Sequence, residues 1–182
     1  NAVLKYGTFT SVPTMMTRRQ VIDVVGDFQW EKFASASDID LYLRMAKQWG
    51  PIGIIDEPLH RYRISPSQGS AKINKMRTFR AHGLAVIDYY LSIPEIRIYA
   101  QPDSLLRHEI HCAGDDITRA INMSILGQQV EACQLMDAAF SKLPLRTRLK
   151  QHVCSRVFLL GHIYKIALRI GLGKDLVFIY KN

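Results

Sequence analysis

A helix predicted over residues 37–49 constrains the fold of this chain more than any other segment. Its first turn holds two carboxylates, Asp38 and Asp40, where the positive end of a helix dipole favours them. Apolar residues recur along one side at helical spacing, and Gly50 followed by Pro51 ends the pattern. That apolar side includes Leu41, Leu43 and Met45. The segment therefore predicts an amphipathic helix that buries one side and presents paired carboxylates at its start.

Two short apolar runs follow the helix, over residues 52–55 and 59–64, and Asp56-Glu57-Pro58 separates them as a turn. They predict a pair of strands beside the helix, and so a small α/β part near the N-terminal end of the chain. Because side chains alternate along a strand, His60 and Arg63 point to opposite faces. The strand pair would bring both basic side chains near the start of the helix.

This succession of motifs resembles the family 2 glycosyltransferases of the GT-A fold. That family has an acidic Glu-Asp motif at a helix start, an Arg about two turns later, an apolar strand and a Tyr-Arg. Here Asp38 matches the Asp of the motif, while Ser37 stands where the Glu is usual. Arg44 matches the helical Arg, and Tyr62-Arg63 matches the Tyr-Arg. The resemblance covers roughly residues 10–70.

The resemblance implies roles for individual residues. Asp38 would be the catalytic base, because an acceptor hydroxyl that attacks an anomeric carbon needs a carboxylate within reach to accept its proton. Arg63 would bind donor phosphate, and His60 lies where some GT-A enzymes place a metal ligand. We also expect Asp40 and Trp30 to contact the substrate, Trp30 by stacking on a sugar ring.

Most of these residues also have a structural interpretation. The two acids suit the first turn of any helix, with Ser37 as its N-cap. Arg44 follows Asp40 by four positions, the spacing of a salt bridge on a helix. Trp30 equally suits core packing, and a single His60 is more often structural than a metal ligand.

A GT-A glycosyltransferase also has a nucleotide-binding half, whose Asp-x-Asp motif holds a divalent metal and the donor diphosphate. No Asp-x-Asp precedes the acceptor segment here, and Asn1-Ala2 reads like the remnant of a cleaved tag. We therefore expect residues 1–70 to be the acceptor side of a longer, inverting enzyme that uses a nucleotide sugar and Mg²⁺ or Mn²⁺. Its product would be a cell-surface polysaccharide or glycolipid. The chain alone is expected to be inactive and to hold no metal.

Beyond a boundary at residues 65–70 the pattern becomes helical, so residues 71–182 predict an all-helical subdomain and the whole chain a mainly α fold. The predicted helices cover residues 71–91, 103–126, 128–142 and 145–170. Small residues predict close pairing of the second and third, as in a tetratricopeptide-like hairpin. The alternative function is therefore a non-catalytic helical interaction module, and whether Asp38 faces an open cleft distinguishes the two.

The net charge of +8 is concentrated in the second part of the chain. Residues 1–70 hold 8 Lys/Arg and 7 Asp/Glu, a net of +1, whereas residues 71–182 hold 16 and 9, a net of +7. An anionic membrane surface is the expected partner of the basic helix over 145–170, and a solvated basic face is the alternative. Nucleic acid is disfavoured, because the aromatic residues near the end of the chain lie among aliphatic ones.

The remaining features concern location and assembly. No apolar run approaches the roughly 20 residues that span a bilayer. Three widely spaced cysteines suit reduced thiols, so we expect a cytoplasmic protein, peripheral at the inner face of the membrane. Val3, Leu4, Tyr6 and Phe9 would form an exposed apolar face, which predicts a dimer.

Overall fold

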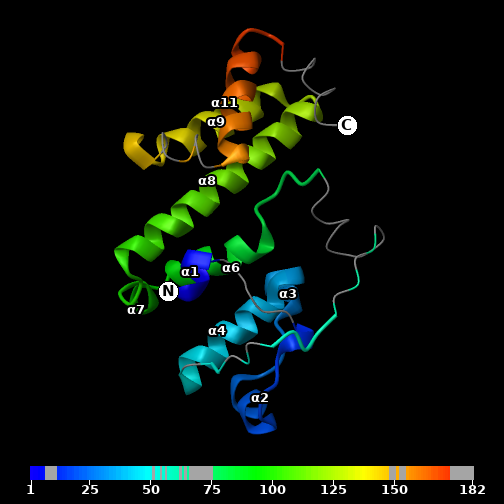
Figure 1. The fold of residues 1–182 in the computed structure, drawn as a ribbon, viewed down its shortest axis with the longest axis vertical. Helices are drawn as coiled ribbons and strands as arrows, with labels where there is room; N and C mark the ends of the chain where they lie inside the picture. Colours follow the sequence, from blue (N-terminus) through cyan, green and yellow to red (C-terminus); the bar gives the residue numbers. More distant parts are fainter. Residues whose placement is uncertain are drawn as a thin grey trace. The chain divides into compact units, whose positions relative to one another are not determined.

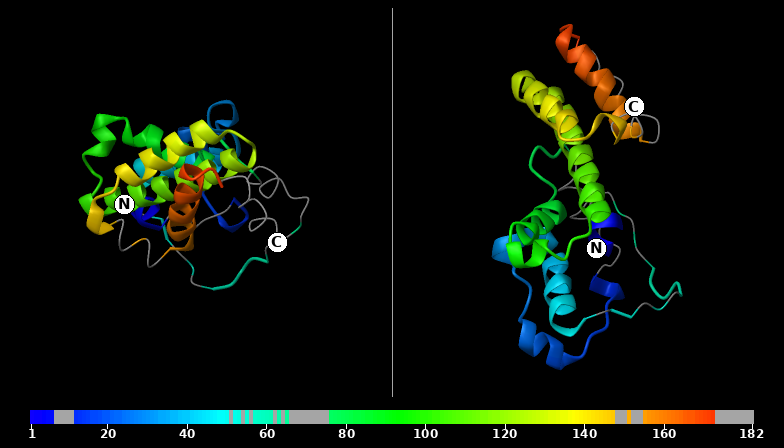
Figure 2. Two further views of the ribbon diagram at one scale, coloured as in Figure 1. Left: turned by 90° about the horizontal axis from the view of Figure 1, so that it is seen from above. Right: turned by 90° about the vertical axis from the view of Figure 1, so that its left-hand side faces the viewer.

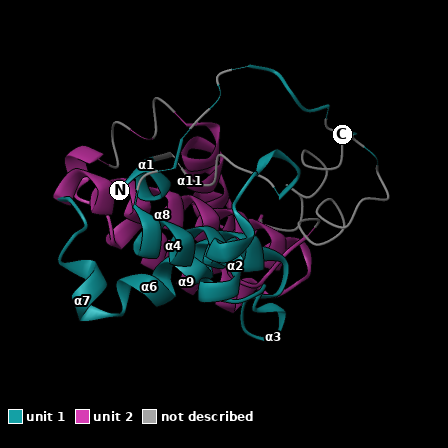
Figure 3. Ribbon diagram, turned by 90° about the horizontal axis from the view of Figure 1, so that it is seen from below, with its two compact units in different colours: residues 1–73, 81–101 teal, residues 74–80, 102–182 magenta. Residues whose placement is uncertain are grey.

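The computed structural model describes residues 1–6, 12–50, 52–53, 55, 57–61, 63, 65, 76–147, 151 and 155–172. These residues form helices joined by turns and loops, and no strand occurs among them (Figure 1, Figure 2). The chain divides into two compact units, residues 1–73 with 81–101 and residues 74–80 with 102–182 (Figure 3). The mainly α fold class is confirmed.

The helices are distributed unevenly between the two units. The first unit contains α1 (Ala2–Tyr6), the 3-10 helix η1 (Val12–Thr14), α2 (Arg19–Val25), α3 (Trp30–Phe33), the 3-10 helix η2 (Ala34–Ala36), α4 (Ser37–Trp49), α6 (His82–Leu91) and α7 (Pro94–Arg97). The second contains α8 (Pro102–Ile125), α9 (Gln129–Ser141) and α11 (Arg156–Arg169). The sequence pattern assigns residues 81–101 to the second region, whereas they pack with the first unit.

The core of the first unit forms where α6 packs against α3, η2 and α4. Phe33, Ile39 and Val86 are buried there, together with Ala36. The rings of Phe33 and Tyr89 meet edge to face with centroids 5.4 Å apart, an arrangement that aromatic pairs favour. This packing holds the first turn of α4 in a fixed orientation.

Helix α4 has the bounds that the sequence predicts. Leu41 and Met45 are buried on its apolar side. Gly50 ends the helix with φ at +82°, a value that favours glycine, and its N–H donates to the carbonyl of Ala46 at 3.0 Å. The N-cap is Ala36 and not Ser37, because η2 leads directly into α4.

The strand pair predicted over residues 52–55 and 59–64 is wrong for the described residues of both runs, which have no regular secondary structure. Ile52, Ile55 and Leu59 are 54%, 71% and 71% exposed. An isolated two-stranded hairpin is marginal in water and needs a third strand or a packed face. These aliphatic side chains lack a packed face, so the small α/β part and the GT-A half are absent from the described residues.

The N-terminal residues belong to the first unit. The side-chain amide of Asn1 donates to the carbonyl of Tyr99 at 3.3 Å, and its oxygen accepts the N–H of Gln101 at 2.8 Å. Leu4 is buried, which removes it from the apolar face predicted to be exposed, and Phe9 lies outside the described residues.

In the second unit, α8 and α9 form a hairpin whose bounds lie within one residue of the prediction. Gly127 occupies the turn with φ at +88°, which lets the chain reverse between the helices. Ala120, Ala132 and Ala139 are fully buried, as the predicted close approach of the two helices requires.

Helix α11 packs on both helices of this hairpin. Phe158 meets Phe140 of α9 edge to face, with ring centroids 6.2 Å apart. A Cβ at Gly161 would lie 2.5 Å from Cγ2 of Ile117, so glycine is needed for the approach to α8. The helix predicted over 145–170 is interrupted before α11 because Ser155 is extended, with φ −134° and ψ 119°.

Ion pairs tie the segment that precedes α6 to α8. Arg77 pairs with Asp115 at 2.6 Å, and Arg80 pairs with Asp116 at 2.9 Å. Lys142 also reaches Asp116, at 2.9 Å. Both carboxylates are buried, and an unpaired buried charge is costly, so these cations stabilise the second unit.

The same segment explains why the helix predicted over residues 71–91 is shorter in the structure, where the described residues before α6 are not helical. The carbonyl of Thr78 accepts a hydrogen bond from Arg119 at 2.9 Å, and the carbonyl of Arg77 accepts one from Asn122 at 2.8 Å. Side chains of α8 therefore bind carbonyls that a helix would use internally.

Candidate functional site

Asp40 is committed to the framework of the first unit. Its side chain is 1% exposed, and its Oδ2 accepts hydrogen bonds from Arg44, at 2.9 Å from Nε and 2.8 Å from Nη2. The hydroxyl of Tyr90 on α6 donates to Oδ1 at 2.6 Å. Burial, followed by this hydrogen bond to a carboxylate, raises the pKa of Tyr90 above its ordinary value of 10.0. Protein donors occupy both oxygens of Asp40, so the carboxylate links α4 to α6.

Arg44 extends this framework toward α2. Its Nη2 donates to the carbonyl of Asp27 at 2.8 Å, and its Nη1 donates to the carbonyls of Val25 and Gly26. These carbonyls lie at and just after the C-terminal end of α2, where helical partners are lacking. The salt bridge expected between Arg44 and Asp40 is thus present, and it also fixes the turn that leads toward α3.

Asp38 lies on the same first turn but has a different environment. The carboxylate is partly exposed, and its Oδ1 accepts the N–H of the neighbouring Ile39 at 2.8 Å. Asp38 is therefore the carboxylate of the predicted pair that remains accessible to a ligand.

Tyr42 lies one helical turn beyond Asp38 and was not among the site residues predicted from the sequence. Its hydroxyl is buried and makes no hydrogen bond within the described part of the chain. Burial raises the pKa of Tyr42, and the negative charge of Asp38 raises it further. The four-residue spacing was the available signal, because residues i and i+4 share a face of a helix. Such an unsatisfied buried hydroxyl is uncommon in folded proteins.

Trp30, expected to stack on a sugar ring, differs in exposure from Phe33 at the other end of the same helix. Phe33 is 8% exposed and belongs to the core, whereas Trp30 is 62% exposed. Trp30 begins α3, which packs against α4, and its ring lies 6.0 Å from the ring of Phe28. Of the two, Trp30 offers a ring face to a ligand.

His60 and Arg63 are exposed and lie on a stretch without regular secondary structure. The strand alternation expected to separate their side chains is therefore not formed by the described residues, and Tyr62 lies outside them. Asp38, Asp40 and Trp30 lie on two helices that pack together, whereas His60 and Arg63 belong to no such element.

The two acids of α4 do not form a site for Mg²⁺ or Mn²⁺ by themselves. These ions are held through carboxylates together with water and substrate phosphates. Asp38 has an accessible carboxylate, but both oxygens of Asp40 are already bound by Arg44 and Tyr90. No step of the chemistry proposed below therefore depends on a metal held by this pair.

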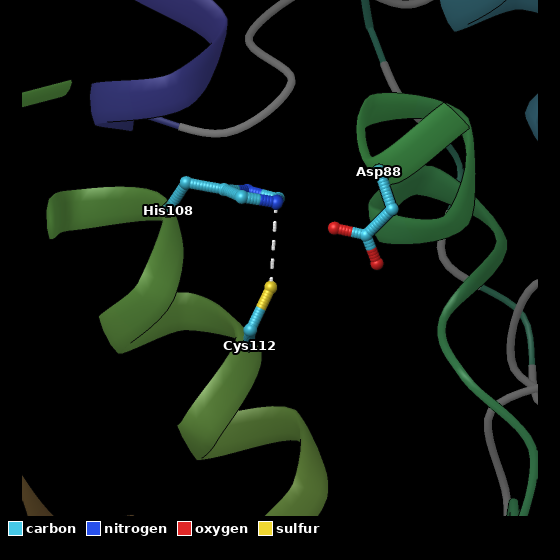
Figure 4. Close-up of side chains that lie close together, drawn as sticks. All are labelled: Asp88, His108 and Cys112. Carbon is cyan, nitrogen blue, oxygen red and sulfur yellow. Dashed lines mark hydrogen bonds between the residues drawn. The ribbon is translucent and has the colours of Figure 1, made fainter. Parts of the chain in front are cut away.

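A second pair of potential ligands lies in the second unit. His108 and Cys112 occupy successive turns of α8, both buried, with Nε2 and Sγ 3.4 Å apart (Figure 4). Neither Cys112 nor Cys133 forms a disulfide, and Cys154 lies outside the described residues. The His-x-x-x-Cys spacing was the sequence signal for this pair. A structural zinc takes four ligands, so His108 and Cys112 alone supply half of a set.

None of the described helices combines the length and the apolar character that crossing a bilayer requires. No family model, curated protein or solved structure matches this chain.

Proposed function

We propose that this chain supplies the acceptor side of an inverting glycosyltransferase that uses a nucleotide sugar, with Asp38 as the base. The observation that carries the proposal is the difference between the two acids at the start of α4. Asp40 is buried and bound by Arg44 and Tyr90, while Asp38 is partly exposed on the same turn. One acid thus serves the framework, and the other is free to act on a substrate.

The chemistry requires one carboxylate and a positioned hydroxyl. As the acceptor oxygen bonds to the anomeric carbon, its proton passes to Asp38 and the bond from that carbon to the nucleoside diphosphate breaks. Attack opposite the leaving group inverts the anomeric centre. General base catalysis of this kind contributes about 10²- to 10⁴-fold to the rate.

Two further residues of the first unit suit such a substrate. The hydroxyl of Tyr42 is buried one helical turn from Asp38 and has no hydrogen-bond partner among the described residues; in this proposal it becomes exposed when the acceptor binds and pairs with a sugar hydroxyl. Trp30, on the helix packed against α4, has the exposed aromatic surface on which a sugar ring can stack. In this proposal the exposed Arg63 binds donor phosphate.

The test is release of nucleoside diphosphate by the full-length protein with mixed nucleotide sugars, varied hydroxyl acceptors and Mn²⁺. Asp38→Asn should lower kcat by about 10²-fold or more while donor binding is retained. Asp23→Asn is the matched control, because Asp23 is an exposed acid on α2 of the same unit, and its turnover should equal that of the native protein.

Unchanged turnover of Asp38→Asn would refute the assignment of the base. If the native protein transfers no sugar with any donor and acceptor offered, the enzyme proposal fails and the helical interaction module becomes the better account of the chain.

A further inference from the structure

Helix α11 has one face that is fully used in packing. Helix α11 packs on α8 and α9 (Figure 1). Phe158, Gly161, Tyr164 and Ala167 recur every three residues along it and are buried. This face accounts for the attachment of α11 to the second unit. Among the described residues, the opposite side of the helix takes no part in the core.

The opposite side carries a row of large aliphatic side chains. Leu159, Ile163, Ile166 and Ile170 are 50%, 46%, 50% and 63% exposed, and we call them the aliphatic stripe. Their spacing of four, three and four residues places them along one line of a helix, because each residue turns the chain by about 100°. Single exposed apolar residues are ordinary on a protein surface, whereas a contiguous exposed apolar patch is typical of an interaction site.

Helix α11 itself contributes only positive charges beside the stripe. Helix α11 contains no Asp or Glu, and its exposed polar residues beside the stripe are Arg156, His162 and Arg169. One acid on a neighbouring helix, Asp137, accepts a hydrogen bond from Arg169 at 3.4 Å. Residues 142–182 as a whole contain 9 Lys/Arg and a single acid.

This charge pattern distinguishes between two partners that could cover the aliphatic stripe, a second copy of the chain and an anionic bilayer. A second copy of the chain fits the spacing, since a repeat of four and three residues is that of a coiled coil. Pairing two such helices would, however, bring Arg156 into line with the seam and set the basic flanks of both copies against each other. An anionic bilayer accepts the aliphatic side chains among its acyl chains and attracts the same cations.

We propose that the aliphatic stripe of α11 binds the surface of an anionic bilayer, with the helix lying in the plane of the membrane. A helix of 14 residues is about 21 Å long, which suits an interfacial position. The proposal stands independently of the sugar transfer proposed above, because it rests on a different unit and on different residues.

The experiment measures sedimentation of the whole chain with vesicles of phosphatidylcholine and phosphatidylglycerol at a ratio of three to one. The native chain should bind these vesicles at low salt, bind weakly at high salt, and bind pure phosphatidylcholine vesicles at least tenfold less well. Ile163→Gln with Ile166→Gln should lower the partition coefficient at least tenfold, because two aliphatic side chains no longer enter the acyl region. Glutamine is a good helix former, so α11 should persist, which circular dichroism verifies.

Val130→Gln is the matched control, since Val130 is a 67% exposed aliphatic residue on α9 that lies outside the stripe, and it should bind as the native chain does. The proposal is overturned if the double variant binds anionic vesicles as well as the native chain does. It is also overturned if the native chain binds neutral and anionic vesicles equally. Sedimentation equilibrium without lipid measures whether the chain dimerises, and so tests whether a second copy covers the stripe. A native dimer that the double variant abolishes, together with no vesicle binding, would assign the stripe to a second copy and overturn the membrane proposal.

Discussion

Removing the carboxylate of Asp40 should destabilise the first unit far more than removing that of Asp38. Asp40→Ala deletes the partner of Arg44, whose side chain is 16% exposed, and of the Tyr90 hydroxyl. Breaking a buried ion pair by removing one member costs about 3–5 kcal/mol, and Arg44 would then keep only its hydrogen bonds to the carbonyls of Val25, Gly26 and Asp27. The free energy of unfolding should fall by that amount, a large part of the stability of a small unit.

Asp38→Ala removes only a partly exposed acid in the first turn of a helix. Its interaction with the helix dipole is worth about 0.3–1 kcal/mol. The chain also provides a control with the same spacing, because Arg19 and Asp23 on α2 form an i,i+4 pair at 3.7 Å, with side chains 92% and 59% exposed. Removing Asp23 should cost about 0.5 kcal/mol or less.

Urea unfolding followed by tryptophan fluorescence measures these differences in the relevant unit. The two tryptophans of the chain, Trp30 and Trp49, both lie in the first unit. Their shared transition therefore reports the unit that contains Asp40. A loss below about 1 kcal/mol for Asp40→Ala, or equal losses for Asp38→Ala and Asp40→Ala, would refute the division of roles between the two acids.

Three other outcomes are expected. Gly161→Ala should destabilise the second unit by about 1–3 kcal/mol in thermal unfolding, because the added Cβ meets Ile117. Because the pKa of Tyr90 is raised in the folded chain, the stabilisation that this tyrosine provides is complete below pH 10 and is lost as the pH rises further. The free energy of unfolding should fall there by at most about 1.4 kcal/mol per pH unit. Tyr90→Phe should flatten this slope in urea unfolding at alkaline pH. The pKa of Asp137 is lowered chiefly by its hydrogen bond from Lys165, so this contact stabilises the folded chain above about pH 4 and is lost as pH falls further, and Asp137→Asn should weaken the acid dependence of unfolding.

The helices could be predicted from the sequence where local signals mark both of their ends. Acids in the first turn and a glycine at the end placed α4 correctly, and a glycine turn placed the hairpin of α8 and α9 to within one residue. The strands over 52–55 and 59–64 failed, because a strand is stabilised by partners outside its own sequence. The early start predicted for α6 failed for a similar reason, since distant side chains of α8 bind the carbonyls of Arg77 and Thr78.

The candidate site, like the helices, could be predicted only where a local sequence pattern marks it. The i,i+4 spacing is a local signal, and it was sufficient to identify the pair of Asp40 and Arg44. Tyr90, 50 residues further along, joins that pair only through the packing of α6 on α4, which no local pattern indicates. The buried hydroxyl of Tyr42 also depends on tertiary packing, although its position one turn beyond Asp38 was visible in the sequence.

The two acids at the start of α4 cannot exchange roles. Residues two positions apart on a helix point about 200° away from each other, so a side chain at position 40 faces the core when one at position 38 faces outward. Ile39 between them is buried against Val86 of α6, which fixes the rotation of the helix. Asp40 would have to break its bonds to Arg44 and Tyr90 before it could accept a proton from a substrate. If Asp38 is the base, Asp38→Asn should therefore lose activity without any compensation from the acid two residues away.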